Sequence, residues 1–385
     1  MIFLTGHIRK RGTQSGSSWQ IVLDHGIDSC GKRKRSYITV KGNKKEAQAI
    51  LNEKLAEYNK GTYISPSSKT VKDCIEEWVA VYVEPSLAPN TVRGYKVNFN
   101  NHTIPYIGHI PVQQLTPVQV QGLYSQLEKK GLSARSIRYV HTTLREALQY
   151  AYQAQYIAKN VADLVSPPKQ GKHKTSVYTE KMVIEMLRCA EDTEMEIPLV
   201  IAVELGLRRG ELLALKWSDI DWEKRTIEIQ RNLVCIDKEY IFGSTKTESG
   251  QRSLLLSEPL LKRLDKHRRD QNKIRLLLGS GYQNQDLIYC KKDGSPYHAG
   301  TLSHKFKTFL EKNKLSRIRF HDLRHTNATL LLQYGVPAKI ASQRLGHANI
   351  AITLDTYSHV STEMQEDAVS KLASGVLGRL DEHVR

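Results

Sequence analysis

Two short polar segments, each containing proline, divide this chain of 385 residues into three parts. The first segment covers residues 61–69 and contains Pro66, and the second covers residues 166–175 and contains two prolines and one glycine. Segments of this composition are typical of linkers between folded bodies, because they do not favour a continuous helix or strand. We therefore predict three domains, at residues 1–62, 68–166 and 176–385, and the chain is long enough to give each a core.

The first domain is basic, with 12 lysines and arginines against 5 acidic residues. Residues 19–23 and 32–40 have the pattern of two strands joined by a turn that contains Gly26 and Gly31. Apolar residues at helical spacing follow the strands, so we predict a small β-sheet plus a helix that carries Ala47, Leu51, Leu55 and Tyr58. Small sheets read DNA by laying strands into a groove, which makes the basic cluster of the second strand a candidate DNA contact: Arg33, Lys34 and Arg35. The alternative is a hairpin with a solvated charged face.

The second domain is predicted to be helical throughout. Apolar residues recur at helical spacing in four stretches: Val71, Ile75, Trp78 and Tyr82; Val92, Tyr95 and Phe99; Val118, Leu123 and Leu127; and Ile137, Val140, Leu144, Leu148 and Tyr152. We expect these residues to form the core, with Asn90 and Thr91 capping the second helix, Gly131 ending the third and Ser133 opening the fourth. Four basic residues between the apolar positions are candidate phosphate contacts, although a solvated surface charge explains each of them equally simply: Arg93, Lys96, Arg135 and Arg138.

The third domain is predicted to be mostly helical with an inserted sheet, whose strands cover residues 226–234, 240–246 and 252–256. The fold class of the whole chain is therefore mostly α with small β-sheets (α+β). No run of about 18 apolar residues is present, so the sequence predicts no membrane span. The five cysteines are scattered and form no CxxC pair, which favours reduced thiols in a cytosol over disulfides or a zinc site.

The formal net charge of +17 favours a polyanionic partner, because bound counterions are released when basic side chains meet DNA or RNA. A protein that is merely basic, or one that binds an anionic membrane surface, has the same charge. The third domain contains residues that narrow this choice. Arg208 and Glu211 are three apart at the start of an expected helix that continues through Trp217, and a carboxylate at this spacing orients a guanidinium for bidentate phosphate binding.

Four further residues of the third domain extend this pattern. His321 and Arg324 share the spacing of the first pair, and Lys246 lies in the turn between two expected strands, where a hairpin tip places an ammonium in a groove. His347 follows a helix end, and Tyr357 lies ten residues later. Taken alone, each has an ordinary structural explanation, such as a surface salt bridge or a core tyrosine. Together they occur once, in one order, in one domain of a basic protein, which favours chemistry on a phosphate.

This set resembles the catalytic residues of the tyrosine recombinases, the phage integrase family. The resemblance extends to the stretches GLRRGELLALKWSDI (residues 206–220), HDLRHT (321–326) and LGH (345–347). It implies an N-terminal domain that binds arm-type DNA sites, a helical domain that binds core-type sites, and a mixed α/β catalytic domain. The family pattern maps onto six catalytic positions without departure: Arg208, Lys246, His321, Arg324, His347 and Tyr357.

The resemblance implies a site-specific recombinase that cuts and rejoins DNA through a 3′-phosphotyrosine without metal, cofactor or ATP, and no GxxxxGK[ST] loop is present. It implies Tyr357 as nucleophile, His321 as general base, Lys246 as general acid and Glu211 as an orienting group. The implied partners are double-stranded DNA attachment sites and a homotetramer on the synaptic complex, with an excisionase and a host DNA-bending protein as candidates and no membrane.

Three alternatives remain at this point: a chromosome-resolving recombinase, a type IB topoisomerase, and a non-catalytic DNA-binding regulator on the same fold. Residues 1–62 favour an integrase of a temperate phage or conjugative element, because chromosome-resolving members of the family usually lack an arm-binding domain. The tail from Glu363 to Leu380 carries apolar residues at helical spacing. It either docks on a neighbouring protomer or packs on its own domain.

Overall fold

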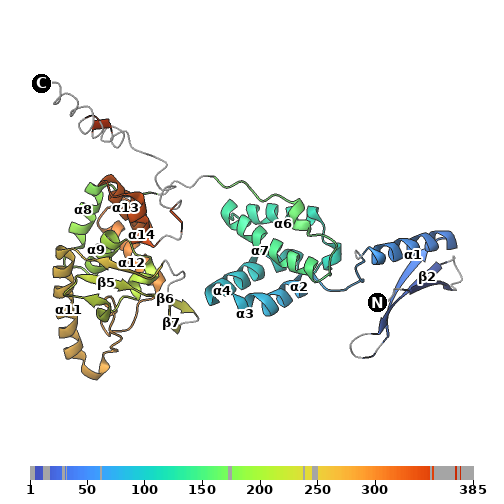
Figure 1. Ribbon diagram of the computed structural model, residues 1–385, viewed down its shortest axis with the longest axis horizontal. Helices are drawn as coiled ribbons and strands as arrows, with labels where there is room; N and C mark the ends of the chain where they lie inside the picture. The colour runs from blue at the N-terminus through green and yellow to red at the C-terminus, as the bar shows by residue number, and fades with distance from the viewer. Residues whose placement is uncertain are drawn as a thin grey trace, which may run out of the picture. The chain divides into compact units, whose positions relative to one another are not determined.

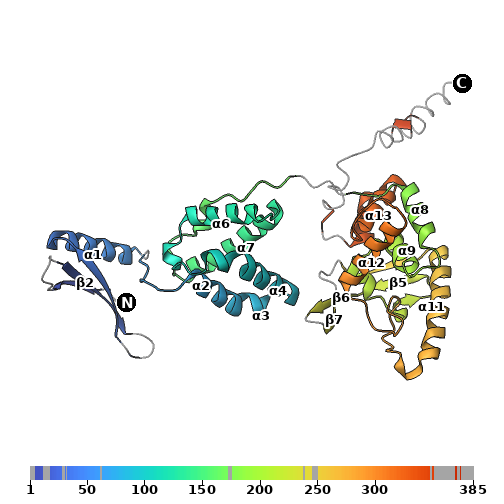
Figure 2. The same ribbon diagram turned by 180° about the vertical axis from the view of Figure 1, so that it is seen from behind.

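The computed structural model describes residues 5–11, 18–27, 31, 33–60, 63–171, 176–236, 239–244, 250–346, 349–350, 369–370 and 373. The chain divides into two compact units, Met1–Lys172 and His173–Arg385, and each is described by itself (Figures 1 and 2). Helices predominate and the sheets are small and antiparallel, which confirms the predicted fold class. Within the described part, no helix combines the length and apolar character needed to cross a membrane.

The first unit opens with a three-stranded sheet in the order β1-β2-β3, formed by Thr5–Arg11, Ser18–Ile27 and Arg33–Lys41. Helix α1 (Lys44–Asn59) begins at a capping box of Asn43 and Glu46 and packs on the sheet. The small core between them contains Ile21, Leu23, Val40, Ala47 and Leu51. Strand β1 was not predicted, because it alternates Ile8 with polar and basic residues and so has too little apolar signal.

The rest of the first unit is helical, with a core of its own that includes Trp78, Phe99 and Leu144. Its main helices are α2 (Val71–Trp78), α4 (Pro89–Asn98), α6 (Pro117–Lys129) and α7 (Ala134–Gln153). Short elements connect them: a π-helical turn at Val79–Val83, α3 (Glu84–Ser86), a second π-helical turn at Phe99–Thr103, α5 (Ile104–Ile107), and 3₁₀ turns at Val112–Gln114 and Val161–Leu164.

Some details of the helical prediction are wrong. Helix α4 begins at Pro89, one residue before the expected caps, because proline at the first helical position has a fixed φ that suits the helix and lacks an N–H that would be unpaired there. Tyr82, Val118 and Tyr152 were expected in the core, yet 57%, 79% and 47% of their surfaces are exposed. Tyr82 lies in the π-helical turn, where the angle per residue changes and rotates it away from the buried face. The expected N-cap at Ser133 is confirmed.

The second unit packs seven helices and two sheets, within the described residues, around one large core that includes Leu212, Ile227 and Phe306. The helices are α8 (Glu180–Ala190), α9 (Glu196–Leu205), α10 (Arg209–Leu213), α11 (Glu258–Leu278), α12 (Ala299–Lys312), α13 (Asp322–Gln333) and α14 (Ala338–Leu345). Short 3₁₀ turns cover Trp217–Asp219 and Gly279–Gly281. One sheet has the order β4-β5-β8 (Ile220–Asp221, Thr226–Ile229, Arg252–Leu255), and β6 (Arg231–Ile236) pairs with β7 (Glu239–Ser244) in the other.

Three predictions about this unit are corrected. The expected strand 226–234 is two strands, β5 and β6, which belong to different sheets. Strands β7 and β8 also belong to different sheets and do not pair with each other, so they are not the expected hairpin, and residues 245–249 between them lie outside the described residues. The helix expected to continue through Trp217 ends at Leu213, because the amide of Trp217 donates to the Asp286 carbonyl (2.8 Å) instead of to a carbonyl one turn earlier.

Candidate active site

Arg208 lies in the turn between α9 and α10, as the residue directly before α10. Helix α9 ends at Gly206, whose φ of +61° reverses the chain. The contact expected between Arg208 and Glu211 is present. The Arg208 amide donates to Glu211 Oε2 (3.0 Å), and its Nη1 donates to Glu211 Oε1 (2.7 Å). The Arg208 side chain is 40% exposed while that of Glu211 is 2% exposed, so the carboxylate holds a guanidinium that still faces solvent.

Arg324 lies in the first turn of α13 and is 4% exposed. Its Nη1 donates to the Gly206 carbonyl (2.8 Å), and its Nη2 donates to the Leu345 carbonyl (2.5 Å). Burial, followed by the charge of Arg208, lowers the pKa of Arg324 to about 9. The guanidinium therefore stays protonated at neutral pH and supplies a positive charge that is largely shielded from solvent.

A third arginine, Arg252 at the start of β8, was not predicted. Its side chain is 8% exposed. It donates from Nη2 to Glu211 Oε2 (3.0 Å), from Nε to the Arg344 carbonyl (2.6 Å) and from Nη1 to the Gly250 carbonyl (2.9 Å). Nothing in the sequence separates it from a surface charge, except that the apolar run 254–256 begins two residues after it.

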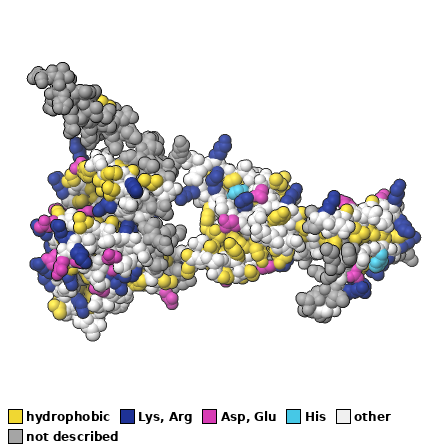
Figure 3. Space-filling view, viewed as in Figure 1, with side chains coloured by type: hydrophobic (Ala, Val, Ile, Leu, Met, Phe, Trp, Pro, Cys, Tyr) yellow, Lys and Arg dark blue, Asp and Glu magenta, His cyan; other side chains and the backbone are white. Residues whose placement is uncertain are grey.

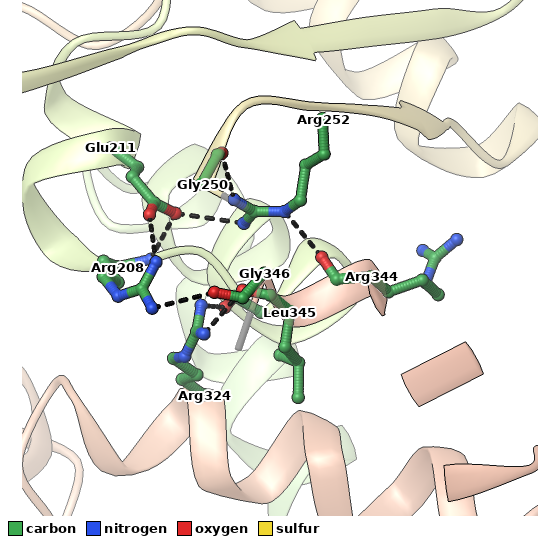
Figure 4. A network of polar contacts seen from close by, with 9 residues as sticks. Arg208, Glu211, Gly250, Arg252, Arg324, Arg344, Leu345 and Gly346 are labelled. Carbon is green, nitrogen blue, oxygen red and sulfur yellow. Dashed lines mark hydrogen bonds and ion pairs between the residues drawn. The ribbon is translucent and has the colours of Figure 1, made fainter. Parts of the chain in front are cut away.

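The three arginines and Glu211, called the arginine cluster below, meet at the C-terminal end of α14 (Figure 4). Carbonyl groups at this end of a helix lack partners within the helix and carry the negative pole of its dipole, so they attract cations. Gly346 ends the helix with a φ of +66°. Three consecutive carbonyls each accept from a different arginine: Arg344 from Arg252, Leu345 from Arg324 and Gly346 from Arg208.

The charges of the arginine cluster do not cancel. Burial alone would raise the pKa of Glu211, but its ion pairs and hydrogen bonds with Arg252 and Arg208 outweigh burial and hold this pKa below its ordinary value. Glu211 is therefore ionised at neutral pH and offsets one of the three positive charges. Arg208 is the exposed member, so the site has a surplus of positive charge where a phosphate from solvent can reach it.

His321 directly precedes α13, and its ring packs edge-on against His325 with 5.4 Å between centroids. By surface area the side chain is exposed, while the protein around it still desolvates part of the ring. This desolvation, followed by the charges of His325 and Arg324, lowers the pKa of His321 to about 4. The lowered pKa leaves the imidazole neutral at pH 7, which is the form of the ring that has a nitrogen acceptor.

Three of the six expected catalytic residues, Lys246, His347 and Tyr357, lie outside the described residues, as does most of the tail from Glu363 to Leu380. His347 follows the arginine cluster directly in sequence, since it comes after Gly346. Of the described set, the structure brings Arg208, Glu211 and Arg324 together, and His321 lies on the same turn as Arg324. Among the residues described, no three His, Cys, Asp or Glu side chains are placed to hold a metal ion.

The candidate DNA-contact residues fall into two groups. Arg33 and Arg35 both pair with Asp24 of β2, Lys96 pairs with Glu84, and Arg138 Nη1 donates to the Pro168 carbonyl (3.4 Å). Arg93 and Arg135 are exposed and have no ion pair with the described side chains. The side chain of Lys34 lies outside the described part. Arg93 and Arg135 are therefore the most available of the set for an outside partner.

Comparison with known proteins places this geometry in a family. The profile described as "Phage integrase family" matches residues 176–364, and that of "Phage integrase, N-terminal SAM-like domain" matches residues 70–127, together more than half of the chain. A XerC-like tyrosine recombinase of Caldanaerobacter subterraneus subsp. tengcongensis is 28% identical, covering 92% of this chain and 95% of the relative. The ICEBs1 integrase of Bacillus subtilis is 26% identical, covering 74% and 77%.

Two solved structures have the same fold. The Tn1549 transposon integrase in complex with transposon right end DNA superposes with a TM-score of 0.68 at 22% identity, over 79% of this chain and 99% of that one. A λ integrase tetramer bound to a Holliday junction gives 0.60 at 18% identity, over 87% and 91%. The chain belongs to the phage integrase family. It is a tyrosine recombinase of the kind that phages and integrative elements encode.

Proposed function

We propose that this protein is the site-specific DNA recombinase of a mobile element, and that it integrates and excises the element through a 3′-phosphotyrosine at Tyr357. The observation that carries the proposal is the arginine cluster on the carbonyls of residues 344–346. It supplies fixed positive charge immediately before His347 and eleven residues before Tyr357 in the chain. Members of the phage integrase family act on DNA, and the net charge of +17 suits that partner.

Arg208 and Arg324 stabilise the negative charge that grows on the non-bridging oxygens of the phosphate as a fifth oxygen approaches. His347 donates a further hydrogen bond to the same oxygens. Donors that are held in place before the reaction lower its barrier without a cost of reorganisation. Glu211 keeps Arg208 in position, since it bonds both the amide and the guanidinium of that residue.

Tyr357 gives its phenolic proton to His321 and forms a bond from its oxygen to phosphorus, while the bond from phosphorus to the 5′ oxygen breaks. Lys246 protonates the departing 5′ oxygen. The neutral state of His321 at pH 7 suits a base, and the phenol needs one because its ordinary pKa is about 10. A 5′ hydroxyl of another strand then attacks the phosphotyrosine and reverses these steps.

Because the phosphotyrosine keeps the energy of the phosphodiester, the proposed reaction consumes no ATP, and the roles above are filled by side chains without a metal ion. In the proposed recombinase, residues 1–62 bind arm-type sites, residues 68–166 bind core-type sites, and residues 176–385 catalyse. The proposed partners are double-stranded attachment sites, a homotetramer, an excisionase and a host DNA-bending protein, and we place this assembly in the bacterial cytoplasm.

A chromosome-resolving recombinase is the second candidate, favoured by the name of the XerC-like relative, which matches over 92% of this chain. The N-terminal sheet and α1 favour the element integrase, because they form an additional basic domain that a recombinase does not need for cleavage at a core site. Integrases from Bacillus subtilis and Streptomyces ambofaciens also match most of this chain. Sequencing the DNA that flanks the gene separates the two, since an element integrase lies between direct repeats and a chromosome resolvase does not.

The experiment that tests the proposal compares cleavage with binding in Arg208→Ala. The unsubstituted protein is expected to recombine two plasmids that carry the ends of the element, with junctions at one defined point. Arg208→Ala is expected to slow cleavage on the order of a hundredfold or more while DNA affinity changes far less. Equal losses in cleavage and affinity would mean that Arg208 only binds the DNA backbone. If the unsubstituted protein bound DNA without recombining it, a non-catalytic regulator would be favoured.

A further inference from the structure

A cavity of about 470 Å³ lies beside the candidate active site in the second unit. His321 is part of its wall, and so is Arg209, the residue directly after Arg208. The wall is formed by the start of α10, one side of α12 and the segment that leads into α13. Among the described residues that line the cavity, four are lysines or arginines and none is acidic. The cavity is therefore a candidate site for an anion.

Arg209 is a partly buried cation that has no ion pair with the described side chains. Its Nη1 donates to Ser303 Oγ of α12 (2.6 Å), and this neutral hydroxyl satisfies one donor without offsetting the charge. Burial lowers the pKa of Arg209, and no described carboxylate opposes the shift. A guanidinium in this state is stabilised by an anion that binds to its remaining donors.

The other three cations of the cavity add to the positive charge. The side chain of Arg319 pairs with Asp322 (2.8 Å), and Lys307 Nζ lies 3.7 Å from Glu311 Oε1. Arg317 is exposed and has no ion pair with the described side chains. Four cations and two carboxylates leave a surplus of two positive charges, which suits a phosphodiester better than a neutral ligand.

The rest of the wall is apolar. It includes Phe306, Ile318 and Phe320, and the two phenyl rings pack edge-on with 5.4 Å between centroids. The volume of the cavity falls in the range of sites that bind small organic molecules, and it exceeds what a bare phosphate fills. A phosphate that carries a deoxyribose therefore fits the combination of cations and apolar wall better than an inorganic ion does.

The place of the cavity indicates which phosphate it would bind. The Cα atoms of Arg208 and Arg209 are consecutive and so lie about 3.8 Å apart, while consecutive phosphates of one DNA strand are about 3.4 Å apart along the helix axis. The Arg208 side chain turns to Glu211 and the Gly346 carbonyl, whereas that of Arg209 turns to Ser303. Two neighbouring arginines thus face two different sites at the spacing of neighbouring nucleotides.

We infer that this cavity binds a sugar-phosphate unit of the cleaved strand beside the scissile phosphate, and that Arg209, held by Ser303, binds its phosphate. The inference rests on the proposed function and adds to it a second phosphate site that takes no part in the chemical step. Arg209 positions the strand by binding it, so its loss weakens DNA binding. Loss of Arg208, in contrast, slows cleavage of DNA that is already bound.

The test uses the full-length protein and a set of core-site duplexes. Each duplex has a single uncharged methylphosphonate in the cleaved strand, at the scissile position or at one of the positions on either side of it. The variants are Arg209→Gln, which removes the charge, and Arg209→Lys, which keeps the charge but not the fork of donors. Arg269→Gln is the matched control, because Arg269 is an exposed arginine that pairs with Asp265 on α11, outside the cavity.

For the unsubstituted protein, one methylphosphonate beside the scissile position is expected to weaken binding on the order of tenfold, as for the loss of a hydrogen bond to a charged group. Arg209→Gln is expected to bind the all-phosphate duplex more weakly by a similar factor. The same methylphosphonate should then weaken its binding by less than about twofold, because the two changes remove one contact. Methylphosphonates at the other positions are expected to act alike on both proteins.

Arg209→Gln at saturating protein is expected to cleave the all-phosphate duplex within about threefold of the unsubstituted rate. Arg209→Lys is expected to show an intermediate loss of binding at the same position, and it keeps the test decisive if thermal unfolding shows that Arg209→Gln is unstable. Arg269→Gln is expected to bind every duplex as the unsubstituted protein does.

The inference is overturned if every methylphosphonate weakens the binding of Arg209→Gln as much as that of the unsubstituted protein. It is also overturned if the position coupled to Arg209 is the scissile one, because Arg209 would then act with the arginine cluster. Unchanged binding of Arg209→Gln to a single site, together with loss of the tetramer, would assign the cavity to a protein partner instead. Failure of the proposed function is distinguishable, because the unsubstituted protein would then cleave no duplex while the binding measurements would still report on the cavity.

Discussion

At the scale of single residues, the site depends on cations that the fold holds in place before DNA arrives. The contact between Arg208 and Glu211 was predictable, because a spacing of three residues at a helix start brings two side chains together. The part that Arg252 plays in the arginine cluster was not predictable, since it lies 41 residues from Glu211 in the chain and two of its acceptors are backbone carbonyls. Backbone acceptors have no signature in the sequence, and only the folded chain defines them.

His321 is expected to make the protein sensitive to acid. Desolvation, with His325 and Arg324, lowers its pKa in the folded protein to about 4, against about 6.5 in the unfolded chain. A lowered folded-state pKa contributes stability above the unfolded value, and that stability is lost as the pH falls from about 6.5 toward 4. Asp322 opposes the shift and Arg319 adds to it, and His325, whose own pKa is also lowered, titrates beside it.

The measurement is thermal unfolding between pH 7.5 and 4.5 for the unsubstituted protein and His321→Gln. We expect the unsubstituted protein to lose stability more steeply than the variant below pH about 6.5. Parallel curves would show that His321 has the same pKa in both states, and would remove the support for a neutral base that this shift provides.

At the scale of elements, apolar periodicity predicted most helices and failed where tertiary contacts intervene. The helix start at Ser133 and the helix end near Gly131 were predictable, because capping residues mark both in the sequence. The division of residues 226–234 between two sheets was not predictable, because both strands have the same apolar pattern and only their partner strands differ. The site was predictable as a set of residues, but its assembly on the end of α14 depends on elements that are far apart in sequence.

Gly206 is expected to be intolerant of substitution because it links two of these elements. Its φ is +61°, its carbonyl accepts from Arg324, and an added Cβ would lie 2.5 Å from Leu345 Cδ2 and 2.6 Å from Asn327 Oδ1. Gly335 is the matched control, since its φ is +77° and an added Cβ would meet nothing within 4 Å.

Gly335→Ala is expected to lower the free energy of unfolding by about 1 kcal/mol, the usual cost of a left-handed conformation in alanine. Gly206→Ala adds a steric clash worth roughly 1–3 kcal/mol and should lose correspondingly more. Denaturant unfolding of both variants measures the difference. Equal losses would show that the contacts of Gly206 with Leu345 and Asn327 adjust easily to an added methyl group, and that this packing does not restrain the arginine cluster.

At the scale of the whole molecule, positive charge is spread over both units and is not confined to the unit that contains the arginine cluster. Lysine and arginine side chains lie on the surface of each unit in the view of Figure 3. The proposed function uses this distribution, because phosphate contacts set affinity and orientation while the arginine cluster performs the chemistry. Exposed arginines without an intramolecular partner are the best candidates for such contacts.

Arg135 and Arg145 of α7 allow a matched test, because both substitutions remove one charge from the same helix. Both arginines are exposed, but Arg145 pairs with Asp163 at 2.5 Å and Arg135 has no ion pair with the described side chains. Arg135→Gln is expected to weaken DNA binding and to reduce the slope of log affinity against log salt concentration by about 1, as for the loss of one phosphate contact. Arg145→Gln is expected to leave the slope nearly unchanged. If Arg145→Gln reduced the salt slope more than Arg135→Gln, the DNA would lie against a different face of α7.

The most direct test of the account is covalent trapping on a nicked core-site duplex, in which the short 5′ fragment diffuses away after cleavage and prevents resealing. The unsubstituted protein is expected to form a complex that survives denaturing gel electrophoresis, with the DNA attached to the peptide that contains Tyr357 by mass spectrometry. Tyr357→Phe is expected to bind the duplex with the same affinity and to form no such complex. A covalent complex from Tyr357→Phe, or attachment to any other residue, would contradict the central claim.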